Sequence, residues 1–130
     1  MSGTPTAAGP MPDREYIYDA RLERVIDGDT AILTFDFGFG EEHTESVRLL
    51  GVNCPEVTGA TRAAGLAAKD YTERWLAAAD TPPTDWPLVA QSFKSDHFGR
   101  WLAFIWRKSD RHSLNDDLLA DGQAVPDPGP

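Results

Sequence analysis

Alternating apolar and polar positions near the start of the chain predict two β-strands joined by a tight turn. Every second residue from Tyr16 to Leu22 is apolar, as in a strand with one face in water, and residues 31–37 alternate again. An Asp-Gly pair stands between the two runs and favours a hairpin, because glycine supplies positive φ readily. We therefore expect a hairpin that turns at Gly28.

A third, central strand is predicted from Val47 to Val52, where apolar residues dominate. Pro55 then ends it, because proline cannot donate a hydrogen bond to a sheet. Residues 37–45 are punctuated by glycine and rich in glutamate, so we expect a loop there, with His43 as a solvated residue.

The middle of the chain predicts a long helix. Residues 61–79 carry apolar side chains at spacings of three and four, and the proline-rich residues 80–87 end the pattern. Such a helix would pack one face on the sheet. The expected apolar stripe consists of Ala64, Ala67, Ala68, Tyr71, Trp75 and Ala78.

Two more strands and a short helix are predicted after the prolines. Residues 88–94 alternate and residues 101–106 are strongly apolar, with a glycine-containing turn between them. Ser113 can cap a helix at residues 112–120, and Gly122 ends it. Five strands, one helix inserted before the last hairpin and a short C-terminal helix predict an α+β fold, a five-stranded OB-fold-type barrel.

Length and composition set the expected domain organisation. The 130 residues suffice for one domain, which we expect at 15–125, between a flexible leader at 1–14 and a flexible tail at 126–130. The chain has no apolar run long enough to span a membrane, and its N-terminus lacks the pattern of a secretory signal. Cys54 is the single cysteine, which agrees with a reducing compartment. Together these features lead us to expect a cytoplasmic protein that does not bind membranes. A monomer is the default expectation.

The charge balance bears on the class of partner. The chain has 12 lysines and arginines against 21 aspartates and glutamates, a net charge of −9. Binding of nucleic acid without sequence preference depends mainly on neutralising phosphates. A phosphodiester substrate would therefore need a local basic patch, divalent cations or both.

Charged residues stand where predicted strands begin or end. Arg48 lies inside the third strand and Glu56 just beyond it, Asp27 and Asp29 flank the turn, and Arg100 precedes the last strand. Each group has a structural alternative: an Arg48–Glu56 ion pair, turn-forming aspartates, and an arginine whose stem covers apolar surface. Two carboxylates on a tight turn would instead offer hard oxygen ligands to a divalent cation.

The order of these motifs resembles that of the staphylococcal nuclease (thermonuclease-like) family. Over roughly residues 18–125 the chain carries I-D-G-D-T, then V-R-L-L-G-V-N-C-P-E, then a helix, then D-H-F-G-R-W-L-A-F-I-W. The resemblance implies an OB-fold barrel with helices. It also implies a calcium-dependent endonuclease that hydrolyses DNA and possibly RNA, leaving 3′-phosphate ends.

The resemblance also implies roles for single residues. A diester attack adds negative charge to the phosphoryl oxygens, which two guanidinium groups and a divalent ion can stabilise. The catalytic residues it implies are Arg48, Glu56 and Arg100. The calcium ligands it implies are Asp29, Asn53 and the backbone carbonyl of Cys54, with Asp27 behind them.

The chain departs from the family's pattern at several positions. Asn53 stands where the family most often has aspartate, so the site keeps a carbonyl ligand but loses a charge, and we expect weaker Ca²⁺ binding. Cys54 replaces a usual threonine, which is harmless if only its carbonyl binds. His97 and Phe98 stand where lysine and tyrosine usually grip a phosphate, and they are the candidate nucleic-acid-binding residues.

Two functions stay open at this point. The first is a metal-dependent nuclease without sequence preference, which the joint presence of Arg48, Glu56 and Arg100 favours. The second is a catalytically weak or inactive nuclease-like module that binds nucleic acid or a protein partner. Asn53 and the net charge of −9 favour this second function.

Overall fold

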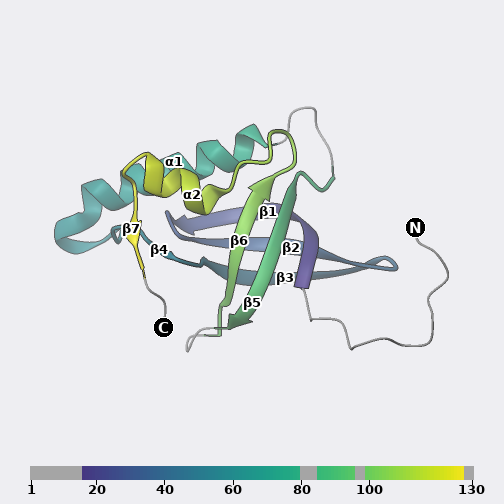
Figure 1. The fold of residues 1–130 in the computed structure, drawn as a ribbon. Coiled ribbons are helices and arrows are strands. Elements are labelled where there is room, and N and C mark those ends of the chain that lie inside the picture. Colours follow the sequence, from purple (N-terminus) through teal and green to yellow (C-terminus); the bar gives the residue numbers. More distant parts are fainter. Residues whose placement is uncertain (1–15, 80–84, 96–98, 128–130) are drawn as a thin grey trace, which may run out of the picture.

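Figure 1 shows a small barrel with two helices on one side. This computed structural model describes residues 16–79, 85–95 and 99–127. Within these ranges, five strands close the barrel in the order β1-β2-β3-β6-β5. The elements are β1 (Tyr16–Asp27), β2 (Thr30–Gly38), β3 (Glu41–Leu49), β4 (Val52–Asn53), the 3-10 helix η1 (Gly59–Thr61), α1 (Arg62–Ala78), β5 (Leu88–Ser95), β6 (Trp101–Arg107), α2 (Leu114–Ala120) and β7 (Val125–Pro126).

The predicted α+β, OB-fold-type barrel is confirmed. Helix α1 is inserted before the β5–β6 hairpin, and α2 follows it. Strands β3 and β6 pair in parallel and so close the barrel, while the other neighbouring strands pair antiparallel. No helix in the described ranges is long and apolar enough to cross a membrane. The predicted leader, residues 1–14, lies outside the described residues.

The β1–β2 hairpin turns where the Asp-Gly pair predicts, with Asp27 paired to Thr30. The reason for the glycine differs from the expectation, because Gly28 does not adopt positive φ. A Cβ atom on Gly28 would lie 2.8 Å from the Cβ of Ala68 and 2.8 Å from the Sγ of Cys54. The glycine therefore allows helix α1 and the Cys54 segment to approach the turn closely.

The loop expected at residues 37–45 is wrong, because β3 already begins at Glu41. The chain reverses instead at Gly38, Phe39 and Gly40, whose φ angles are 86°, 57° and 79°. Pairing with β2 continues along the acidic segment. That pairing outweighs the weak strand propensity of glutamate, which depends strongly on context.

His43 is likewise not a solvated loop residue but a partly buried member of an aromatic cluster at one end of the barrel. Its ring centroid lies 5.6 Å from that of Phe37 and 5.1 Å from that of Trp101, in stacked arrangements. Its Nε2 atom lies 2.9 Å from Oε1 of Glu45. Through Trp101 the cluster contacts the fully buried ring of Phe35, at a centroid distance of 5.1 Å.

The bounds predicted for the long helix agree with α1, but its predicted apolar stripe is partly wrong. Ala64, Ala67 and Ala78 are exposed, because the face that packs on the barrel includes a glycine and a threonine that the apolar pattern left out. The buried residues of α1 are Gly65, Ala68, Thr72, Trp75 and Leu76.

Gly65 and Thr72 explain why this face was missed. A Cβ atom on Gly65 would overlap the backbone carbonyl oxygen of Glu56, so only glycine permits this contact. The buried hydroxyl of Thr72 donates a 2.7 Å hydrogen bond to the carbonyl of Gly28. Both contacts are polar or steric, and a search for apolar periodicity does not detect them.

The short helix α2 begins at the predicted cap, since Ser113 Oγ accepts a 3.2 Å hydrogen bond from the Asp116 amide. The buried Asn115 connects α2 to the barrel. Its Nδ2 donates to the carbonyl of Leu50 (2.8 Å), and its Oδ1 accepts from the amide of Ile105 (3.2 Å). Asn115 therefore fixes the turn that follows β3.

The C-terminal segment continues the fold beyond the predicted boundary at residue 125. Strand β7 pairs antiparallel with β4, Val52 opposite Pro126 and Asn53 opposite Val125. The next amide, that of Asp127, donates a 3.0 Å hydrogen bond to the carbonyl of Gly51. The last residues of the predicted tail, 128–130, lie outside the described residues.

Gly65→Ala is predicted to destabilise the protein, although alanine is the better helix former. The added methyl must displace the backbone at Glu56, and overpacking of this kind costs about 1–3 kcal/mol. Urea unfolding measures the change. The Ala64→Gly exchange at an exposed position of the same helix serves as the control. It measures the difference in helix propensity between alanine and glycine alone, about 1 kcal/mol. A Gly65→Ala protein that is more stable than wild type would contradict the close contact between Gly65 and the backbone of Glu56.

Candidate active site

The Asp29 carboxylate sits at the β1–β2 turn, where it is buried. Its Oδ2 accepts a 2.7 Å hydrogen bond from the Cys54 amide, and its Oδ1 accepts a 3.1 Å hydrogen bond from the Thr30 hydroxyl. One carboxylate thus links the turn to the segment that follows β3. These bonds fix the position and orientation of its two oxygens.

Asp27 brings a second carboxylate to the same turn. Its Oδ1 is buried, and no hydrogen-bond donor reaches it within the described part of the chain. Burial, together with the neighbouring Asp29 carboxyl, raises the pKa of Asp27 to about 6. A buried acceptor without a donor, beside another acid, is typical of a place that a cation or an ordered water completes.

Arg48 brings a cation to this pair of acids. In the β2–β3 register it lies opposite Thr30, and its side chain is 14% exposed. Its Nη1 lies 3.4 Å from Oδ2 of Asp29, and its Nη2 donates a 3.3 Å hydrogen bond to Oδ1 of Asn53. Arg48 therefore lies within reach of two other residues predicted for the site, Asp29 and Asn53.

The Arg48–Glu56 ion pair that the sequence left open does not occur between these two described residues. Arg48 has other acidic neighbours, Asp29 at 3.4 Å and Asp127 at 3.6 Å. Glu56 is exposed, in the segment that leads to η1. Its backbone carbonyl accepts a 2.8 Å hydrogen bond from the Thr61 hydroxyl, which anchors this segment to the start of the helical region.

Cys54 contributes its backbone and not its thiol. The side chain is buried, and burial, together with the charge of Asp29, raises the pKa of the thiol to about 12. It therefore stays protonated and acts as a small apolar group against Gly28. The amide of Cys54 is the group that binds Asp29.

Arg100 lies just before the strand that pairs with the strand of Arg48. It directly precedes β6, in which Leu102 stands opposite Arg48 in the parallel register, and it is partly buried. The predicted nucleic-acid-binding residues His97 and Phe98 lie outside the described residues.

Several residues that shape the site were not predicted from the sequence. Gly65 and Thr72 had a detectable signal, because a glycine and a threonine interrupt an alanine-rich helical segment. Asn115 and Asp127 had none, since their partners are distant in sequence.

The donors at the turn suit a weak divalent-cation site. Within the described ranges, no three histidine, cysteine, aspartate or glutamate side chains are grouped to hold a metal ion. The charged oxygen ligands available to a cation are the carboxylates of Asp27 and Asp29. The amide oxygen of Asn53 would be a neutral ligand. The Oδ1 of Asp27, which has no hydrogen-bond partner among the described residues, suits a hard cation. A site with only two carboxylate ligands is expected to bind that cation weakly.

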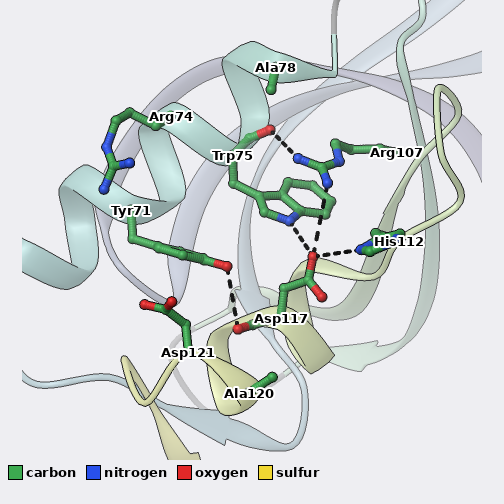
Figure 2. A pocket seen from close by; sticks show the side chains of 9 residues that line it. All are labelled: Tyr71, Arg74, Trp75, Ala78, Arg107, His112, Asp117, Ala120 and Asp121. Atoms are coloured by element: carbon green, nitrogen blue, oxygen red, sulfur yellow. Dashed lines mark hydrogen bonds and ion pairs between the residues drawn. The ribbon is translucent and has the colours of Figure 1, made fainter.

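A separate hollow of about 520 Å³ lies between α1, α2 and the segment after β6 (Figure 2). Asp117 Oδ2 accepts a 2.8 Å hydrogen bond from Nε1 of Trp75 and lies 3.1 Å from Nδ1 of His112. The Arg107 guanidinium stacks over the Trp75 ring at 4.2 Å and pairs with Asp110. These groups bind one another, so the cluster connects α1 to α2 and acts in stability.

Comparison with protein-family models and with curated proteins gives no match to this chain.

Asp27→Asn is predicted to stabilise the metal-free protein at pH 7. Because the folded state raises the pKa of Asp27 from 3.8 to about 6, its carboxyl favours folding at low pH and opposes folding once the pH rises through 6. The gain from the variant should therefore shrink towards zero near pH 4. Urea unfolding at both pH values measures it, with the exposed Asp85→Asn as control. A variant that is less stable than wild type at pH 7 would contradict the claim that the ionised Asp27 carboxylate opposes folding.

Proposed function

We propose that the protein is a divalent-cation-dependent, sequence-nonspecific nuclease that hydrolyses phosphodiester bonds of DNA or RNA. The observation that carries the proposal is the Arg48 guanidinium held 3.4 Å from the buried Asp29 carboxylate, beside Asp27, whose Oδ1 has no hydrogen-bond partner among the described residues. A cation site and a fixed guanidinium at the same place can together stabilise the charge that develops during diester hydrolysis. The resemblance to the staphylococcal nuclease family points to the same reaction.

The residues divide into two roles in this proposal. Arg48 and Arg100 stabilise the negative charge that develops on the phosphoryl oxygens, and Arg100 acts as a charge only, because guanidinium does not release a proton at ordinary pH. Glu56, which is exposed to solvent, takes a proton from the attacking water. The water oxygen bonds to phosphorus, the P–O5′ bond breaks, and the departing O5′ takes a proton from solvent water, which leaves a 3′-phosphate and a 5′-hydroxyl.

A Ca²⁺ ion bound at the turn would polarise the phosphoryl oxygens. The residues that would hold it are Asp29, Asn53 and the carbonyl of Cys54, with Asp27 behind them. The wild-type affinity should be low, because Asn53 contributes no charge.

The second candidate is a nuclease-like module that binds nucleic acid or a protein without cleaving. Two observations favour it: the neutral Asn53 at the cation site and the net charge of −9. Against it stands the geometry of Arg48, whose guanidinium is held by several hydrogen bonds beside two acids. A surface that only binds phosphate does not require this pair of acids.

Purified protein is predicted to cut single-stranded DNA when Ca²⁺ is supplied up to about 10 mM. This range is needed because calcium sites with few charged ligands have dissociation constants of about 0.1–1 mM or more. EDTA should abolish cutting. Glu56→Gln should remove most of the turnover and leave the fold intact, because the side chain is exposed. The exposed Glu73→Gln exchange is the control for loss of one charge. Equal turnover in Glu56→Gln and wild type would refute the base role.

Asn53→Asp is predicted to tighten Ca²⁺ binding and to raise activity at low calcium. The change adds a carboxylate 3.3 Å from Nη2 of Arg48 and gives the cation site a further charge. Isothermal titration calorimetry measures the affinity, and cleavage at a calcium concentration below saturation measures the effect on activity. If neither quantity moves, Asn53 is not a ligand.

A further inference from the structure

The C-terminal strand places a carboxylate on the arginine of the candidate site. Oδ2 of Asp127 lies 3.6 Å from Nη2 of Arg48. The position of Asp127 is set by its backbone, because its amide donates a 3.0 Å hydrogen bond to the carbonyl of Gly51 and the two preceding residues pair with β4. The Arg48–Asp127 contact therefore follows from how the end of the domain closes onto β4.

The hydrogen bonds of Arg48 determine which edge of its guanidinium a phosphate can reach. The two hydrogens of Nη1 are directed to the carbonyls of Leu49 (2.9 Å) and Val52 (2.7 Å). A phosphate that binds the guanidinium in the usual two-point manner needs another edge, and that edge includes Nη2. Nη2 already faces the neutral Asn53 at 3.3 Å and the anionic Asp127 at 3.6 Å.

We propose that Asp127 is an intramolecular competitor of the substrate phosphate for Arg48, so that the C-terminal strand lowers the affinity of the site for nucleic acid. The inference rests on the proposed function, since it assigns the phosphate of the substrate to Arg48. A phosphate that reaches Nη2 takes the place of the Asp127 carboxylate. The anion on Arg48 and the incoming phosphate have the same charge, so they cannot share this edge without repulsion.

Two features allow the carboxylate to move aside. Asp127 is 37% exposed on its side chain, so it passes readily into water. Strand β7 is two residues long and exposed, whereas Arg48 is part of the barrel and is 14% exposed. The arginine thus stays in place while its anionic partner exchanges.

The experiment compares the Michaelis constant for a short single-stranded DNA in calcium between wild type and Asp127→Asn. The variant keeps the size of the side chain and the backbone hydrogen bond to Gly51. Loss of a partly exposed ion pair should lower KM about two- to fivefold. Asp116→Asn, which removes the same charge from an exposed position on α2, should leave KM unchanged, and Asp127→Glu should return it towards the wild-type value.

A KM in Asp127→Asn that equals that of Asp116→Asn, or that rises, overturns the proposal, and a rise would mean that Asp127 positions Arg48 instead. If no variant cleaves DNA, the proposed function fails by itself, and inorganic phosphate then tests Asp127 separately. The NMR signal of the Arg48 Nε–H, assigned with Arg48→Lys, reports phosphate binding in calcium-free buffer. Phosphate should bind about two- to fivefold more tightly to Asp127→Asn. Equal binding, or none to either protein, overturns the proposal.

Discussion

The hydrogen bonds and ion pair of the Asp29 carboxylate hold the candidate site together. This buried group accepts from the Cys54 amide at 2.7 Å and faces Arg48 Nη1 at 3.4 Å, so it joins the β1–β2 turn to the segments on either side of β4. A buried charge that lost these partners would be strongly destabilising. The contacts that keep the barrel's turn in place are therefore the ones that orient the arginine.

Helix α1 supports this arrangement from behind through small side chains. Gly28 and Ala68 meet where the turn touches the helix, and the Thr72 hydroxyl binds the carbonyl of Gly28 at 2.7 Å. Gly65 allows the same helix to touch the backbone of Glu56. A single helix thus positions both the acidic turn and the segment that carries the proposed base, and rigid supports of this kind are what a catalytic site needs.

The elements that depend on local pattern were predictable from the sequence, and the contacts between distant segments were not. The β1–β2 hairpin, the bounds of α1 and the cap at Ser113 follow from short-range signals. Arg48 lies within reach of Asp29 and Asn53, and the roles predicted for these residues stay predictions. The start of β3 was missed because pairing with β2 decides it. Asp127 gave no signal, since its contact with Arg48 forms only when the end of the chain returns to β4.

The central claim is that Arg48 stabilises a reacting phosphate and does not merely hold the fold together. Arg48→Lys tests this most directly, because lysine keeps the charge but loses the fixed guanidinium geometry. The measurement is kcat on single-stranded DNA in saturating calcium, corrected for the folded fraction from urea unfolding. We expect a loss of about 10²-fold or more in kcat. A corrected kcat equal to that of wild type, or a wild-type protein without calcium-dependent cleavage, would contradict it.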